Sequence, residues 1–415
     1  MAQNNSIDIL FPGARIDLFA FSEETKAIFE GFKDDWRFAR VTIDAQKASI
    51  DQAIEKYKEY SSPDLVIIGT DDISENFINK LGELAGHCVE GTEAIIIGPE
   101  NDVKLYRRLV GMGVRDYLVR PVQAEDIVQI IGASLFEKIG ITESRLVAVV
   151  GAKGGVGATS MAQSLAWLSA EQLGQKTLIL DAAGGWSTLN VAFGVEPTSE
   201  LKECLRNATE GSEEDLARMY VSITDNLTLF ACGGDDLFGY AANGDTYEKA
   251  LDRLMKTYPV VIVDLSYAPI AVRQRVTERA HEIVVVTTPE LPSLRLARSV
   301  LNDIKVRRGK NDGAVDLILN KHGRLGKREI NEKDMVTALE HKPQAYVPYL
   351  ADVFHTADTV GEVALKQKGG DTIVNNLMGL AKKITGHKGV PAKTQAVTAP
   401  TGLLDRLMAG LKKRD

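Results

Sequence analysis

The segment VVGAKGGVGATS, residues 149–160, joins an apolar run typical of a strand to a stretch with helical spacing that starts near Ser160. A glycine-rich turn in this context lets successive backbone N–H groups and the positive end of the helix dipole surround an anion. We therefore predict a phosphate-binding loop in an α/β domain. The residues expected at the phosphates are Lys153, Gly154, Gly155, Val156, Gly157, Ala158, Thr159 and Ser160.

The loop departs from the common pattern G-x-x-x-x-G-K-[ST] at two positions. Ala152 stands at the first glycine, and Ala158 stands where a lysine normally reaches the outer phosphates. Lys153 offers a cation five residues earlier. The charge that usually neutralises phosphate is therefore displaced within the loop.

On both sides of the loop, short apolar runs alternate with helical patterns. The continuous apolar strands are typical of parallel sheets covered on both faces. The fold class is therefore predicted to be α/β, with two doubly wound parallel-sheet domains, the first flavodoxin-like. The expected strands are Ile16–Phe21, Ala39–Ile43, Asp64–Ile68, Ala94–Ile97 and Asp116–Val119, then Leu146–Val150, Thr177–Leu180, Leu227–Phe230, Val260–Asp264, Ile283–Thr287, Leu317–Leu319 and Gln344–Val347.

The predicted domains are residues 1–140 and 141–386, followed by a tail of residues 387–415. The tail begins as a flexible linker and ends in LLDRLMAGLKKRD, whose apolar residues share one helical face. Six basic residues against Asp405 and Asp415 give the tail a charge of +4. Contact with a membrane surface or a partner is one interpretation, and packing on its own domain is the other.

The composition argues against a nucleic-acid-binding, zinc-binding, membrane-spanning or secreted protein. The chain of 415 residues has a net charge of −8, which does not favour nucleic acid as a partner. Its three cysteines lack metal-ligand spacing, so zinc is not expected. No apolar run reaches the length of a membrane span, and residues 1–21 lack the pattern of a secretory signal. We therefore expect a cytoplasmic location.

Lysine followed by GGVG and two hydroxyl residues resembles the deviant phosphate loop of the MinD/ParA family. The resemblance implies ATP and Mg²⁺ as cofactors and a homodimer in which Lys153 reaches the partner's nucleotide. It implies that Thr159 and Asp264, the end of strand 260–264, hold the metal. Asn320 and Pro348 match the family's contacts with the base. A turn residue at the strand end is the alternative for Asp264.

The same resemblance indicates incomplete hydrolytic machinery. In the family an Asp-x-Asp pair follows the second strand, whereas this chain reads Asp181-Ala182-Ala183. With Ala158 and Ala183 in place of a lysine and a water-orienting aspartate, we expect at most a weak ATPase. The candidate catalytic residues are Lys153, Asp181 and Asp264.

The first domain resembles the receiver domain of response regulators, most clearly at DYLVRP, residues 116–121. Arg120 replaces the family's lysine, and Gly69 occupies the position of the phosphoacceptor aspartate. Phe21 and Ser22 stand where an acidic pair is expected. We therefore predict a pseudo-receiver used for docking or dimerisation.

An atypical receiver joined to a MinD/ParA-like domain is similar to the TadZ/CpaE family. The resemblance implies an ATP-dependent dimer that marks a site, often a cell pole or the membrane, and recruits the secretion machinery of type IVb (Flp/Tad) pili. The alternative is a ParA-like DNA-binding partition or regulatory ATPase. That alternative rests on a basic stretch that also suits a solvated or partner-binding surface: Lys305, Arg307, Arg308, Lys310, Lys321, Arg324, Lys327 and Arg328.

Overall fold

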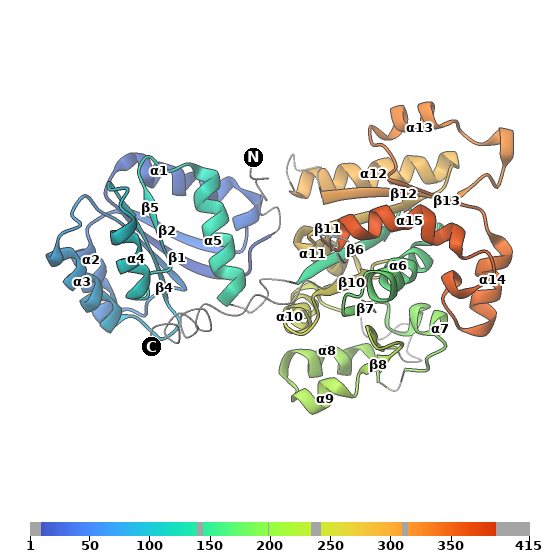
Figure 1. Cartoon of the computed structure of the whole chain (residues 1–415), viewed down its shortest axis with the longest axis horizontal. Helices are drawn as coiled ribbons and strands as arrows, with labels where there is room; N and C mark the ends of the chain where they lie inside the picture. Colours follow the sequence, from blue (N-terminus) through green and yellow to red (C-terminus); the bar gives the residue numbers. More distant parts are fainter. Residues whose placement is uncertain (1–9, 139–143, 198, 234–241, 309–313, 387–415) are drawn as a thin grey trace, which may run out of the picture.

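The computed structural model describes residues 10–138, 144–197, 199–233, 242–308 and 314–386. Two β-sheets, each flanked by helices, form two α/β domains (Figure 1). The predicted fold class is thus confirmed. The linker and amphipathic helix predicted for residues 387–415 lie outside the described residues. In the part that is described, no helix has the length and apolarity to cross a bilayer.

The first sheet has the order β2-β1-β3-β4-β5, and all its strand pairs are parallel. This is the order of flavodoxin-like folds. Each strand overlaps one of the apolar runs expected from the sequence. The strands are β1 (Ala14–Ala20), β2 (Val41–Lys47), β3 (Leu65–Gly69), β4 (Glu93–Gly98) and β5 (Asp116–Val119).

Helices cover both faces of this sheet (Figure 1). One face packs against α1 (Glu23–Gly31) and α5 (Ala124–Lys138). The other packs against α2 (Ile50–Glu59), α3 (Glu75–His87) and α4 (Val103–Gly111). Because both faces are covered, the central strand β3 is apolar and buried along its whole length, whereas the edge strand β2 alternates apolar and polar residues.

The second sheet has the order β13-β12-β11-β6-β10-β7-β9-β8 within the described residues. All its pairs are parallel except β8 with β9. The short edge strand β8 is absent from the sequence prediction, because its side chains are half-buried or exposed and form no apolar run. The strands are β6 (Arg145–Gly151), β7 (Thr177–Asp181), β8 (Tyr220–Ser222), β9 (Leu227–Phe230), β10 (Val260–Asp264), β11 (Glu282–Thr287), β12 (Val315–His322) and β13 (Ala345–Pro348).

Helices also sandwich the second sheet, and the central strand β6 delivers its loop to the middle of one sheet edge. One face packs against α6 (Ala158–Trp167), α7 (Leu189–Ala192), α14 (Ala351–Val360) and α15 (Asp371–Ile384). The other packs against α8 (Leu201–Glu210), α9 (Glu213–Ala217), α10 (Gly244–Met255), α11 (Ile270–Arg279), α12 (Leu291–Arg308) and α13 (Glu332–Leu339).

The two domains contact each other through helices α10, α11 and α12. The guanidinium of Arg308 lies 5.6 Å from the ring centroid of Trp36 in the first domain. Arg40 of the first domain forms an ion pair with Glu248 of α10, whose side chain is only 2% exposed. The domains are therefore joined by specific side-chain contacts as well as by the connecting chain.

Candidate functional site

The candidate phosphate loop lies between the end of β6 and the first turn of α6. Gly155 and Gly157 have φ angles of 79° and 88°, in the left-handed region that L side chains rarely adopt. A Cβ at Gly157 would lie 2.5 Å from the side-chain nitrogen of Asn320. Glycine is therefore required where the backbone turns into the helix, and the turn leaves N–H groups at a helix start for an anion.

Two lysines lie at this loop. Lys153 Nζ donates a hydrogen bond to the carbonyl of Gly154 at 3.2 Å, and Lys321 Nζ donates to the carbonyl of Gly155 at 2.7 Å. Burial lowers the pKa of Lys321, and the nearby charges of Arg324 and Lys153 lower it further. Lys321 thus brings a second cation to a loop in which Ala158 has replaced the usual lysine.

The sequence pattern assigns Lys321 only to the basic stretch and not to the site. Its position depends on tertiary contact between β12 and the loop, which a single sequence does not reveal. The one available signal is that Lys321 directly follows Asn320, a predicted site residue.

Thr159, Asp264 and Ser266 form a hydrogen-bonded group beside the loop. Thr159 Oγ1 donates to Asp264 Oδ2 at 2.6 Å, and the backbone N–H of Ser266 donates to Asp264 Oδ1 at 3.0 Å. Burial raises the pKa of Asp264, and hydrogen bonds from Ser266 and Thr159 act against that rise.

This group offers a hydroxyl and a carboxylate, the hard oxygen donors that Mg²⁺ takes together with water and nucleotide phosphates. Among the described residues, no set of three or more His, Cys, Asp or Glu side chains could hold a metal. The donors at Thr159 and Asp264 therefore fit Mg²⁺ that arrives with a phosphate ligand, rather than a metal held by protein alone.

Asp181 ends β7 in register with Asp264 on the neighbouring strand β10. Its carboxylate accepts hydrogen bonds from the backbone of Ala183 at 3.1 Å and from the hydroxyl of Ser187. Burial raises the pKa of Asp181 to about 7, with a further contribution from the charge of Asp264. The structure brings Asp181 to the site, but both of its oxygens accept hydrogen bonds within the turn that follows β7.

Two cavities adjoin the loop, and Gly157 lines both. The smaller, of about 150 Å³, is lined by residues 153–159 together with Gly151, Thr188, Ser266 and Tyr267. The larger, of about 300 Å³, is lined by Asn320 and Lys321 on one side and by Pro348 and the residues after it on another. A nucleotide whose phosphates bind at the loop therefore has room for its nucleoside in the larger cavity.

Asn320 and Pro348 both line the larger cavity. Asn320 is 3% exposed, and its side-chain nitrogen donates to the carbonyl of Val156 at 2.8 Å. Its side-chain oxygen accepts from the backbone N–H of Lys321 at 2.9 Å. Asn320 thus braces the phosphate loop as well as lining the cavity.

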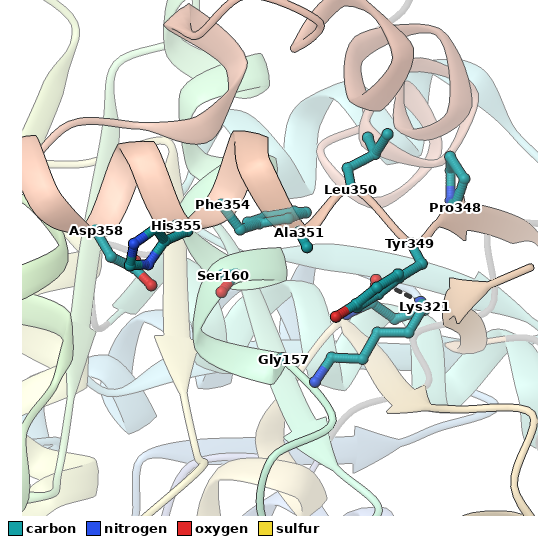
Figure 2. Close-up of a pocket in the computed structure, with 11 residues that line it drawn as sticks. Gly157, Ser160, Lys321, Pro348, Tyr349, Leu350, Ala351, Phe354, His355 and Asp358 are labelled. Atoms are coloured by element: carbon teal, nitrogen blue, oxygen red, sulfur yellow. Dashed lines mark hydrogen bonds between the residues drawn. The ribbon is translucent and has the colours of Figure 1, made fainter. Parts of the chain in front are cut away.

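Helix α14 supplies a wall of this cavity that the sequence pattern does not identify. Figure 2 shows Phe354, His355 and Asp358 along the helix, with Tyr349 on the segment before it. These residues belong to no recognisable sequence motif. They line the cavity because the turn after β13 brings α14 close to Gly157 and Ser160. Only their closeness in sequence to Pro348 could have indicated them.

Two arginines of the basic stretch that supports the DNA-binding alternative are held by contacts within the protein. Arg308 is buried and donates to the carbonyl of Ala280 at 3.0 Å. Arg307 forms ion pairs with Asp303 at 3.0 Å and with Glu278 at 3.2 Å. Lys310 lies outside the described residues. Arg307 and Arg308 are therefore engaged in contacts within the protein.

The first domain is tightly packed at Gly69, the position that the sequence comparison with receiver domains assigns to the phosphoacceptor. A Cβ on Gly69 would lie 2.7 Å from the backbone nitrogen of Phe21. The guanidinium of Arg120 lies 5.0 Å from the Phe21 ring centroid, donates to the carbonyl of Thr70 at 3.1 Å and pairs with Asp71. Position 69 thus has no room for an aspartate without a shift of the neighbouring loop.

Comparison with known proteins gives matches for the second domain. The family model described as cellulose biosynthesis protein BcsQ matches residues 144–306, which include the phosphate loop, β10 and α11. The septum site-determining protein MinD of Thermotoga maritima is 26% identical over 274 residues, covering 63% of this chain and 95% of that protein.

Two solved structures are also similar. The ParA family ATPase of Chlorobium tepidum is 21% identical with a TM-score of 0.49, and the match covers 57% of this chain and 98% of that one. The pilus assembly protein CpaE of Caulobacter crescentus is 30% identical with a TM-score of 0.29, over 30% of this chain and 95% of that one.

Proposed function

We propose that the second domain is a MinD/ParA superfamily ATPase and that the protein is a nucleotide-gated scaffold. It binds ATP with Mg²⁺, dimerises around the bound nucleotide, and positions the assembly and secretion machinery of a type IVb (Flp/Tad) pilus. The main support for nucleotide binding is the hydrogen bond of 2.6 Å from Thr159 Oγ1 to Asp264 Oδ2. This hydrogen bond lies where the glycine loop leads into helix α6.

Each site residue has a role in this proposal. The phosphates bind to the backbone N–H groups of residues 154–158 and to the ammonium of Lys321. The turn of the loop and the position of Lys321 Nζ at Gly155 support this role. Thr159 and Asp264 hold Mg²⁺, which screens phosphate charge when bound. Asn320 and Pro348 border the base. Lys153 reaches the nucleotide of the partner copy.

Weak hydrolysis follows from what the loop and the turn after β7 lack. Ala158 supplies no ammonium at the outer phosphates, and Ala183 supplies no carboxylate to orient water. Asp181 is nearby, but its oxygens already accept hydrogen bonds from Ala183 and Ser187. Binding is therefore expected to be retained better than turnover.

Exposed apolar side chains near the loop support dimerisation through this edge. Tyr267 lines the smaller cavity, Ile270 begins α11 and Leu291 begins α12, and their exposed fractions are 53%, 74% and 72%. All three follow the carboxyl ends of β10 or β11, the strands beside β6. Covering them with a second copy would also exclude water from the nucleotide.

The role in pilus assembly rests on the pairing of the two domains. The first domain has glycine at position 69 and an arginine ion-paired beside it, which supports docking rather than phosphotransfer. We place the protein in the cytoplasm, with recruitment to a cell pole or membrane surface. The basic tail, residues 387–415, is the segment proposed to touch lipid, and it lies outside the described residues.

The test is calorimetric titration of the full chain with ATP and Mg²⁺, followed by measurement of phosphate release. The proposal predicts saturable binding and little turnover. Absence of binding would contradict it, and so would turnover comparable with that of ordinary P-loop ATPases. Binding to random-sequence DNA that falls steeply with added salt would instead favour the ParA-like DNA-binding alternative.

A further inference from the structure

The larger cavity has a polar end that the proposed phosphate and base contacts do not use. His355 and Asp358, one turn apart on α14, line it near Ser160 of α6 (Figure 2). Within the described ranges, the side chains of these three residues make no hydrogen bond or ion pair with protein. They are therefore available to a ligand.

We infer that Asp358, with His355 and Ser160 beside it, binds the ribose hydroxyls of the nucleotide and makes the site select ribonucleotides over deoxyribonucleotides. This inference rests on the proposed function, because it needs the phosphates at the glycine loop.

The order of the two cavities fixes the direction in which the nucleotide lies. The smaller one contains Thr159 and Ser266, the group suited to Mg²⁺, so it takes the outer phosphates. Gly157 borders both cavities, and Ser160 lies only in the larger one. The inner phosphate therefore passes Ser160, and the sugar is the next part of the ligand to enter the larger cavity.

The larger cavity has two chemically different ends. Asn320 and the ring of Tyr349 offer an amide and a flat surface, which suit a nucleobase. His355 and Asp358 offer an imidazole, which can donate and accept, and a carboxylate, which can only accept. A carboxylate accepts hydrogen bonds from two adjacent hydroxyls, and dinucleotide-binding folds hold ribose in this way.

Electrostatics supports the same placement. The carboxylate of Asp358 repels phosphates, whereas Lys153, which lines the smaller cavity, and Lys321, whose ammonium lies at the carbonyl of Gly155, attract them. The phosphates therefore bind at the lysines, and the uncharged diol is the part of the nucleotide that suits Asp358.

The experiment compares ATP, 2′-deoxy-ATP and 3′-deoxy-ATP, each with Mg²⁺, in calorimetric titrations of the full chain. The wild type is expected to bind ATP about tenfold more tightly than at least one deoxy analogue, because a hydrogen bond to a charged group is lost. Asp358→Asn should bring this ratio close to one. Asp352→Asn is the matched control, since Asp352 is exposed on the same helix but does not line the cavity.

Equal affinities of the wild type for the three nucleotides would overturn the inference, and this comparison needs no variant to fold. An unchanged ratio in Asp358→Asn would also overturn it. Failure of the wild type to bind any of the three would contradict the proposed function itself, so the two failures can be told apart.

Discussion

Thr159 and Asp264 lie 105 positions apart in the chain, yet the hydroxyl of Thr159 donates a hydrogen bond to the carboxylate of Asp264 at 2.6 Å. Strand pairing accounts for the contact, because Asp264 ends β10 opposite Val149 of β6, and β6 leads into the loop before Thr159. The sheet thus assembles a hydroxyl and a carboxylate at the place where phosphates would arrive.

Thr159→Ala is expected to remove most of the Mg²⁺ dependence of ATP binding. The wild type should bind ATP more tightly with Mg²⁺ than with a chelator, because the metal bridges the phosphates to this group. Titrations with and without Mg²⁺ measure the difference. Thr209→Ala, on α8 and away from both cavities, is the control and should behave as wild type. Equal Mg²⁺ dependence in Thr159→Ala and wild type would contradict the assignment.

Gly157→Ala is expected to lower the free energy of unfolding by about 1–2 kcal/mol, the cost of a Cβ in the left-handed conformation. The new Cβ also meets the side chain of Asn320. Gly154→Ala in the same loop is the control, because a Cβ there meets no atom within 4 Å. Urea unfolding of the two variants measures the contrast. Equal stability would show that the loop is not held in this conformation.

The strands and the loop could be predicted because their signals are local. Buried parallel strands such as Val260–Asp264 are continuous apolar runs, and the glycines of the loop are dictated by backbone geometry. The edge strand Tyr220–Ser222 has no such run, since an edge is partly exposed and its pattern is set by its neighbour β9.

The part of the site formed by tertiary contacts could not be predicted. Lys321 contacts Gly155 from β12, which lies two strands away from β6 in the sheet. Helix α14 lines the cavity because of the turn that precedes it, and no sequence motif predicts the path of that turn. Asn320 was expected at the base, and the structure adds a bond to Val156 that only the folded loop provides.

Glu282, at the start of β11, should make stability depend on pH. Burial raises its pKa to about 7, Lys383 and Arg145 lower it, and Asp316 raises it. The folded protein therefore holds this proton more tightly than the unfolded chain, whose reference pKa is 4.5. The stabilising contribution is complete below about pH 4.5 and is lost as the pH rises to about 7.

Glu282→Gln does not titrate and should not show that loss. Its stability relative to wild type is expected to increase between about pH 5 and about pH 7.5, as measured by urea unfolding. Glu203→Gln, an exposed position on α8, should show a constant difference from wild type. A constant difference for Glu282→Gln as well would show that the side chain is not buried as described.

Arg40→Ala is expected to loosen the contact between the domains. Arg40 pairs with Glu248, which also accepts from the buried guanidinium of Arg279 at 3.3 Å, so the second domain keeps one partner for this carboxylate. Small-angle scattering should give a larger radius of gyration, with helical content unchanged. Arg206→Ala, exposed on α8, is the control. An unchanged radius would mean that other contacts suffice to hold the domains.

Nucleotide-dependent dimerisation through Lys153 is tested by the molar mass of the protein, measured by light scattering with and without ATP and Mg²⁺, in wild type, Lys153→Ala and the control Lys202→Ala. Lys202 is exposed on α8, outside both cavities. We expect ATP to convert wild type and the control from monomer to dimer and to leave Lys153→Ala a monomer. The same mass in wild type with and without ATP, or an ATP-dependent dimer in Lys153→Ala, would contradict this expectation.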